Sequence, residues 1–166
     1  MQGLIMFIIV VINFILQSTV FQYTRIFGVM PNTALIIVVC IAILKGKHIG
    51  GVIGLLAGFI QDIMFSQTIG PNALVLFFIG YLVGMTDQKL YKDSLFIPFI
   101  ITAISTLAYH GLYYVLMFFL GTNIRFTYFF KRIVLIEILY NSILAIPIYK
   151  WFSKIFTVPS IRFGKR

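Results

Sequence analysis

Short polar gaps divide the chain into six apolar runs, and this pattern constrains its fold more than any other feature. The runs cover residues 3–20, 27–44, 49–65, 71–86, 95–120 and 133–149. A helix needs about 20 mostly apolar residues to cross a bilayer, with a range of about 17–25. The runs lie near this length and lack the polar–apolar alternation of a lipid-facing β-strand. They predict an all-α, polytopic membrane protein, a bundle of six transmembrane helices.

The composition agrees with a surface that faces lipid. Of the 166 residues, 61% are apolar and only 10% are charged, whereas a soluble domain carries about 25% charged residues. The apolar runs leave no stretch long enough for a separate soluble domain. We therefore expect one transmembrane domain over residues 1–166, ending in a basic cytoplasmic tail over residues 150–166.

The distribution of basic residues predicts the orientation. With six spans both termini lie on the same side, and that side holds nine of the thirteen basic residues. Basic loops stay in the cytoplasm, so both termini are predicted to be cytoplasmic. If the run 27–44 did not cross fully, the termini would lie on opposite sides. The cations are spread over short gaps and the tail, where they suit anionic lipid, so the net charge of +9 does not predict nucleic-acid binding.

Glycines recur at a helical spacing in the third and fourth runs. Gly50, Gly54 and Gly58 precede Asp62 at intervals of four residues, which places all of them on one helix face. Gly80 and Gly84 have the same spacing in the next run. Such glycines form a smooth groove against which another helix can pack its backbone. The groove predicts either packing within the bundle or a docking face for the helix of another protein.

Polar residues inside the runs are the other candidates for a site. A charge at the bilayer centre costs about 2.5–3.5 kcal/mol, so acidic side chains there usually face protein or water. Glu137 is expected either to be a hydrogen-bonded carboxyl of the core or to take part in binding. Asp62 lies near a helix end and is expected either to reach the headgroups or to take part in binding. The remaining candidates for buried polar groups are Asn13, Gln17, Asn72, His110 and Asn141.

Two further pairings are expected from helical spacing. Asn13 and Gln17 share a face and are expected to bond to a neighbouring helix. Thr106 lies one turn before His110, so we expect a hydrogen bond between these two side chains.

The sequence carries no recognisable catalytic or metal-binding set. Cys40 is the single cysteine, and His48 and His110 have no cysteine or carboxylate at ligand spacing. Ser105 is rotated by about 140° from His110 on a helix, so the two cannot form a nucleophile–base pair. Phosphate-binding loops, nucleophile elbows and metalloprotease motifs are absent. We therefore expect no enzyme activity, no cofactor and no metal.

The stretch from Gly50 to Gly84 resembles the MreD family of bacterial rod shape-determining membrane proteins. Its sequence is GGVIGLLAGFIQDIMFSQTIGPNALVLFFIGYLVG. The matching features are the glycine ladder that ends in Gln61-Asp62, a short turn over residues 66–70, Gly70-Pro71-Asn72-Ala73, and Gly80-Tyr81-Leu82-Val83-Gly84. The chain length, the number of apolar runs and the polar residues of the first run agree as well.

The resemblance implies a non-catalytic scaffold of the cell-elongation complex in the bacterial cytoplasmic membrane, which helps to control cell shape and peptidoglycan synthesis. The implied partners are MreC, a single-span protein, together with MreB filaments, RodA and its transpeptidase partner. A second copy of the chain is a further candidate partner. The implied fold is similar to the six-helix substrate-binding subunits of energy-coupling-factor transporters. This similarity leaves an alternative function, the capture of a vitamin for import.

Overall fold

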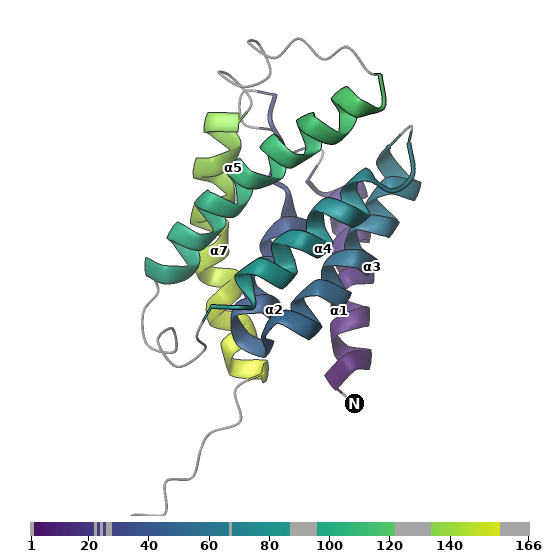
Figure 1. Cartoon of the computed structure of the whole chain (residues 1–166). Helices are drawn as coiled ribbons and strands as arrows, with labels where there is room; N and C mark the ends of the chain where they lie inside the picture. The colour runs from purple at the N-terminus through teal and green to yellow at the C-terminus, as the bar shows by residue number, and fades with distance from the viewer. Residues whose placement is uncertain are drawn as a thin grey trace, which may run out of the picture.

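The computed structural model describes residues 2–21, 23, 25, 28–66, 68–86, 96–121 and 134–156. These residues form six α-helices (Figure 1). The helices are α1 (Gln2–Thr19), α2 (Thr33–Lys45), α3 (Lys47–Phe65), α4 (Pro71–Val83), α5 (Phe96–Phe119) and α7 (Leu135–Phe156). The start of α1, the α2–α3 junction and the end of α7 lie at one end of the bundle, and the α3–α4 junction lies at the other (Figure 1).

Helix α2 is the centre of the bundle. Eleven of its thirteen residues are buried, and it contacts every other described helix. A helix that is apolar on all sides is expected in such a position. The side chain of Asn32 caps its first turn by accepting a hydrogen bond from the backbone N–H of Leu35 at 3.1 Å.

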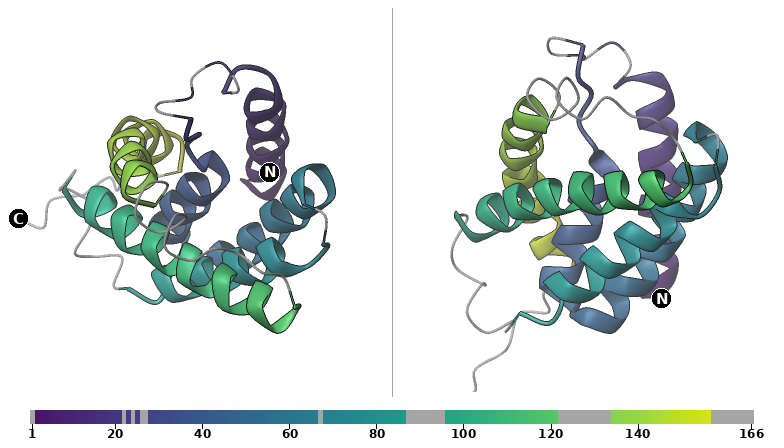
Figure 2. Two further views of the ribbon diagram at one scale, coloured as in Figure 1. Left: turned by 90° about the horizontal axis from the view of Figure 1, so that it is seen from above. Right: turned by 45° about the horizontal axis from the view of Figure 1, so that its top comes forward.

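The other helices surround α2. Helices α3 and α4 form the most extensive helix pair, and α5 packs on both α4 and α7. In Figure 2, α5 runs across the front of the bundle, while α1 and α7 stand on either side of α2. Helix α1 packs on α2 and α3 at the edge of the bundle. The topology therefore leaves α1 and α7 separated by the width of α2.

The outer surface of the bundle suits lipid. Three of the described helices, α3, α5 and α7, are long and apolar enough to cross a membrane. Their outward faces carry large apolar side chains such as Phe59, Phe118 and Leu139, all of which are exposed. Helices α2 and α4 have thirteen residues each and are about 20 Å long, which is shorter than the hydrocarbon core of about 30 Å.

Helices α2 and α4 are shorter than the runs that were expected to form them. The second run was expected to be helical from residue 27, but α2 begins at Thr33. Gly28 has a φ of 82°, and the segment that follows it lines a cavity instead of continuing the helix. The fourth run was expected to reach residue 86, but α4 ends at Val83.

The last helix is longer than expected. The sixth run was expected to end at residue 149, with a basic tail beyond it, but α7 continues to Phe156. The side chains of Phe152 and Phe156 are buried, and the Lys45 ammonium donates to the Phe156 carbonyl at 3.0 Å. Burial of these two rings therefore favours a helical conformation for residues 150–156, which were expected to belong to the tail. Residues 157–166 lie outside the described residues.

Candidate functional site

Helix α4 fills the glycine groove of α3. A Cβ atom built on Gly54 would clash with the backbone carbonyl of Leu76, and one built on Gly58 would clash with the backbone of Ala73. The two backbones therefore approach as closely as glycine allows. A partner helix that docked on this face would have to displace α4.

The second pair of glycines belongs to the same interface. Gly50 and Gly80 face each other, and a Cβ on Gly50 would lie 2.5 Å from the Gly80 carbonyl oxygen. A Cβ on Gly84 would clash with the backbone of Lys47. All five glycines of the predicted grooves thus lie between α3 and α4.

Asp62 lies at the end of α3 and caps the start of α4. Its Oδ2 atom accepts hydrogen bonds from the backbone N–H groups of Gly70 at 2.9 Å and Ala73 at 3.0 Å. Its Oδ1 atom accepts from the backbone N–H and the side-chain amide of Asn72, at 3.1 and 2.9 Å. A carboxylate at a helix N-terminus also interacts favourably with the helix dipole. Asp62 is 0% exposed, so its side chain lies in the interior of the bundle and does not reach the headgroups.

Asn72 connects three helices. Its side-chain amide donates to Asp62 and to the Ser66 hydroxyl, the latter at 2.8 Å. The Tyr109 hydroxyl of α5 donates to the Asn72 side-chain oxygen. The end of α3, the start of α4 and the middle of α5 are thereby joined through one side chain.

His110 and Glu137 form a buried pair between α5 and α7. The Nε2 atom of His110 lies 2.9 Å from Oε2 of Glu137. Both side chains are more than nine-tenths buried. Removing one member of such a pair leaves the other polar group in a medium of low dielectric constant, which is unfavourable.

Asn141 joins α7 to the start of α2 and to α5. Its side-chain oxygen accepts the backbone N–H of Asn32 at 2.9 Å, and its amide donates to the Thr106 hydroxyl at 3.2 Å. Thr106 itself donates to the Thr102 carbonyl at 2.8 Å. The Thr106 hydroxyl therefore bonds to Asn141 and Thr102, and the expected hydrogen bond between Thr106 and His110 is not formed.

A polar cavity of about 270 Å³ lies where α1 and α3 end and α2 and α4 begin. Five helices and the segment before α2 contribute side chains to it. The lining residues are Gln17, Met30, Pro31, Asn32, Gln61, Phe65, Ser66, Asn72, Tyr109, His110, Tyr113 and Glu137. Gln17 and Gln61 are 6% and 9% exposed, and the Oε1 atom of each is buried without a hydrogen-bond partner among the described residues. Buried polar atoms without a partner are uncommon in native proteins.

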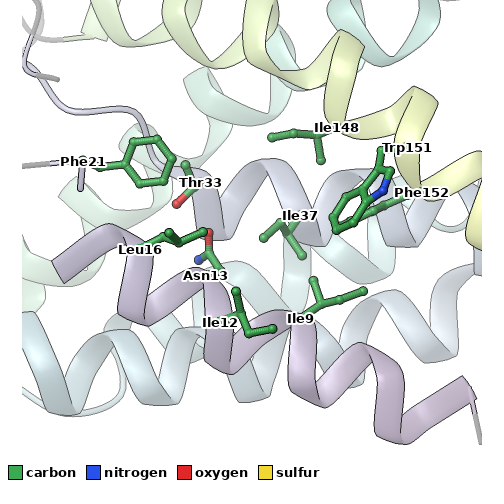
Figure 3. A pocket seen from close by; sticks show the side chains of 10 residues that line it. All are labelled: Ile9, Ile12, Asn13, Leu16, Phe21, Thr33, Ile37, Ile148, Trp151 and Phe152. Carbon is green, nitrogen blue, oxygen red and sulfur yellow. The ribbon is translucent and has the colours of Figure 1, made fainter. Parts of the chain in front are cut away.

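An apolar groove of about 260 Å³ lies between α1 and α7, with α2 as its floor (Figure 3). Besides the indole nitrogen of Trp151, its polar members are Asn13 of α1 and Thr33 of α2, which Figure 3 shows on the same side of the groove. The Thr33 hydroxyl oxygen is buried, and no described residue forms a hydrogen bond with it. Asn13 and Gln17 were expected to bond to a neighbouring helix from one face of α1. In the structure Asn13 lines the groove and Gln17 lines the polar cavity.

Several residues that line the cavity or the groove were not among the candidates from the sequence. Asn32 precedes an apolar run and follows a proline, which is the pattern of a helix N-cap and would have located it. Thr33, Tyr109 and Tyr113 carry no comparable signal, since their role depends on the helices that pack beside them. Among the described residues, no group of three or more His, Cys, Asp and Glu side chains could hold a metal ion.

The fold and the site define a helical membrane protein whose buried polar side chains join its helices to one another. The family model described as rod shape-determining protein MreD matches residues 1–158. The chain therefore belongs to the MreD family of rod shape-determining membrane proteins, as the sequence resemblance indicated. Comparisons with curated proteins and with solved structures returned no match.

Proposed function

We propose that this chain is a non-catalytic membrane scaffold of the cell-elongation complex, and that it binds the transmembrane helix of MreC in the groove between α1 and α7. Family membership supports the first part, and the groove supports the second. Through MreC the chain would be coupled to MreB filaments, to RodA and its transpeptidase partner, and so to peptidoglycan synthesis. The family match lends no support to the alternative, a vitamin-binding transporter subunit.

The groove has the shape that one incoming helix requires. Helix α1 contributes Ile9, Ile12, Asn13 and Leu16, which follow the spacing of a single helix face. These residues cover about 10 Å of the helix axis. The opposite wall is formed by Ile148 and Trp151 of α7. Ile12 and Trp151 are exposed, so the groove is open on its outer side.

The polar groups in the groove favour a protein helix over lipid chains. Asn13 and the hydroxyl of Thr33, which has no partner in the part of the chain that the structure describes, face a largely apolar surface. Lipid chains offer them no hydrogen-bond partner, whereas a helix with a serine, threonine or amide side chain at this depth does. Such bonds between transmembrane helices contribute about 0.6 kcal/mol on average. A helix with small or polar residues on one face fits this surface best.

We further propose that all six helices cross the membrane and that both termini are cytoplasmic. The excess of basic residues on the side of the termini supports this orientation. The short helix α2 fits such a crossing, because the irregular segment before it lines the polar cavity. Irregular backbone at membrane depth is tolerated where it lines a cavity.

The test is recovery of MreC with the tagged chain from native membranes in mild detergent. Ile9→Trp places a large ring in the groove and is expected to reduce MreC recovery severalfold. Ile8→Trp is the matched control, because Ile8 is exposed on a different face of α1 and does not line the groove. Equal recovery of MreC with both variants would exclude the groove as its site. If MreC were recovered with neither the wild-type chain nor either variant, this result would contradict the scaffold function.

A further inference from the structure

We propose that the polar cavity is a binding site for a small organic molecule that carries a primary ammonium group. This inference does not depend on MreC binding. It begins from two hydrogen-bond acceptors, the Oε1 atoms of Gln17 and Gln61, which are buried and have no partner among the described residues. Both side chains line the cavity. An ammonium group has three donors and no acceptor, which is the complement of such a lining.

The charge of the cavity favours the same chemistry. Glu137 lines the cavity, and no lysine or arginine is among its described lining residues. The Nε2 atom of His110 lies 2.9 Å from Oε2 of Glu137 and occupies one acceptor site of that carboxyl group. A carboxylate has about four acceptor sites, so the bond to His110 leaves capacity for a ligand. A buried negative charge is stabilised by an opposite charge close to it.

The helix N-termini at the cavity do not reverse this preference. Both α2 and α4 begin there, and the N-terminus of a helix ordinarily favours anions. At α4 the Asp62 carboxylate already accepts the backbone N–H groups of Asn72 and Ala73. At α2 the backbone N–H of Asn32 is bonded to Asn141. The chain's own oxygens thus occupy these donors, and an anionic ligand would instead meet Glu137.

The remaining walls suit the organic part of the ligand. Tyr109 and Tyr113 stack with their ring centroids 5.9 Å apart, and Phe65 adds a third ring to the lining. Aromatic faces attract both apolar groups and cations. The cavity volume of about 270 Å³ equals the space of about nine water molecules. A molecule of about eight non-hydrogen atoms therefore fits.

Benzylamine, benzyl alcohol and benzoate are three probes of this size that differ in charge. Their binding to the purified full-length chain in detergent would be measured by titration calorimetry, with the heat of empty micelles subtracted. Benzylamine is expected to bind at least about tenfold more tightly than the other two, as for one charge-assisted hydrogen bond. Equal binding of benzyl alcohol, or tighter binding of benzoate, would overturn the proposal.

Variants test whether the binding occurs in this cavity. Glu137→Gln and Gln17→Leu are each expected to weaken benzylamine binding by about tenfold or more. Asn13→Leu is the matched control, because Asn13 is one turn from Gln17 on α1 but lines the apolar groove. If Asn13→Leu weakened binding as much as Gln17→Leu, the site would lie elsewhere. Gln61→Leu replaces Gln17→Leu if the latter fails to give a monodisperse protein.

The same ammonium chemistry occurs in free amines and in phosphatidylethanolamine headgroups. Benzylamine titrations in phosphatidylcholine nanodiscs, with and without phosphatidylethanolamine, separate these two sources. Weaker benzylamine binding in the presence of phosphatidylethanolamine would assign the site to the lipid. Displacement of benzylamine by added ethanolamine, with no effect of the lipid, would assign it to a soluble amine. Benzylamine binding that responded to neither would contradict an ammonium site. Gln17→Leu is expected to recover as much MreC as the wild-type chain does. The ammonium site can therefore fail its test while the proposed scaffold function stands, and the reverse.

Discussion

The carboxylate of Asp62 at the end of α3 accepts both the backbone N–H and the side-chain amide of Asn72 at the start of α4. These residues belong to the two segments on which the resemblance to the MreD family rests. The structure therefore gives this sequence pattern a physical basis, because the carboxylate of one segment caps the helix that the other begins. The cap fixes the α3–α4 hairpin, and through Asn72 it also fixes the position of Tyr109 on α5.

Asp62→Asn is expected to destabilise the protein strongly. The amide has one acceptor oxygen in place of two, so at least two of the four N–H donors around Asp62 lose their acceptor. Each buried donor left without a partner costs about 1–3 kcal/mol. Thermal unfolding in detergent should show a lower midpoint than for Ser66→Ala, which removes only the Ser66 hydroxyl, one of the two acceptors of the Asn72 side-chain amide. Equal midpoints for the two variants would contradict the capping role.

Gly54→Ala is expected to weaken the α3–α4 interface, although alanine favours helix. The added methyl group would overlap the Leu76 carbonyl, so the helices must separate. Overpacking of this kind costs about 1–3 kcal/mol. Gly111→Ala on α5 is the control, since a Cβ there meets no atom of the described residues within 4 Å. That change is expected to raise stability by about 0.5–1 kcal/mol through helix propensity. Opposite shifts in the unfolding midpoint would support the prediction, and shifts of the same sign would refute it.

His110 and Glu137 are expected to show strong energetic coupling. His110→Leu leaves the Glu137 carboxyl without the partner that lies 2.9 Å away, and Glu137→Leu does the same to the histidine. Breaking a buried pair from one side costs about 3–5 kcal/mol, whereas replacing both partners with apolar residues is often nearly neutral. The double variant should therefore be more stable than either single variant. Additive losses in the unfolding free energy would show that the pair is not coupled.

The parts of the fold that depend on local pattern could be predicted from the sequence. The spacing of Gly50, Gly54 and Gly58 placed them on one face, but it could not show whether α4 or a partner covers that face. The answer depends on the turn between α3 and α4, where Asp62 caps the next helix. Continuous hydropathy located the α2 segment but not its start, because Gly28 and Pro31 act on backbone conformation without changing apolar character.

The site was harder to predict, because it is assembled from residues of five helices. Thr106 and His110 are one turn apart, and this local relationship suggested a bond between them. Partners from α7 override it, since Glu137 pairs with the histidine and Asn141 with the threonine. Asn13 and Gln17 share a face in sequence, yet the bundle directs one into the groove and the other into the cavity.

Cysteine labelling of intact cells tests the proposed orientation. Cys40 is fully buried, so the native chain should not react with a membrane-impermeant maleimide. Ile69→Cys places a thiol in the turn between α3 and α4, where Ile69 is 67% exposed. His48→Cys places one at the opposite end of α3, at an exposed position. If the termini are cytoplasmic, the reagent should label Ile69→Cys in intact cells and His48→Cys only after the membrane is permeabilised. The reverse pattern would place the termini outside, and labelling of both in intact cells would mean that α3 does not cross the membrane.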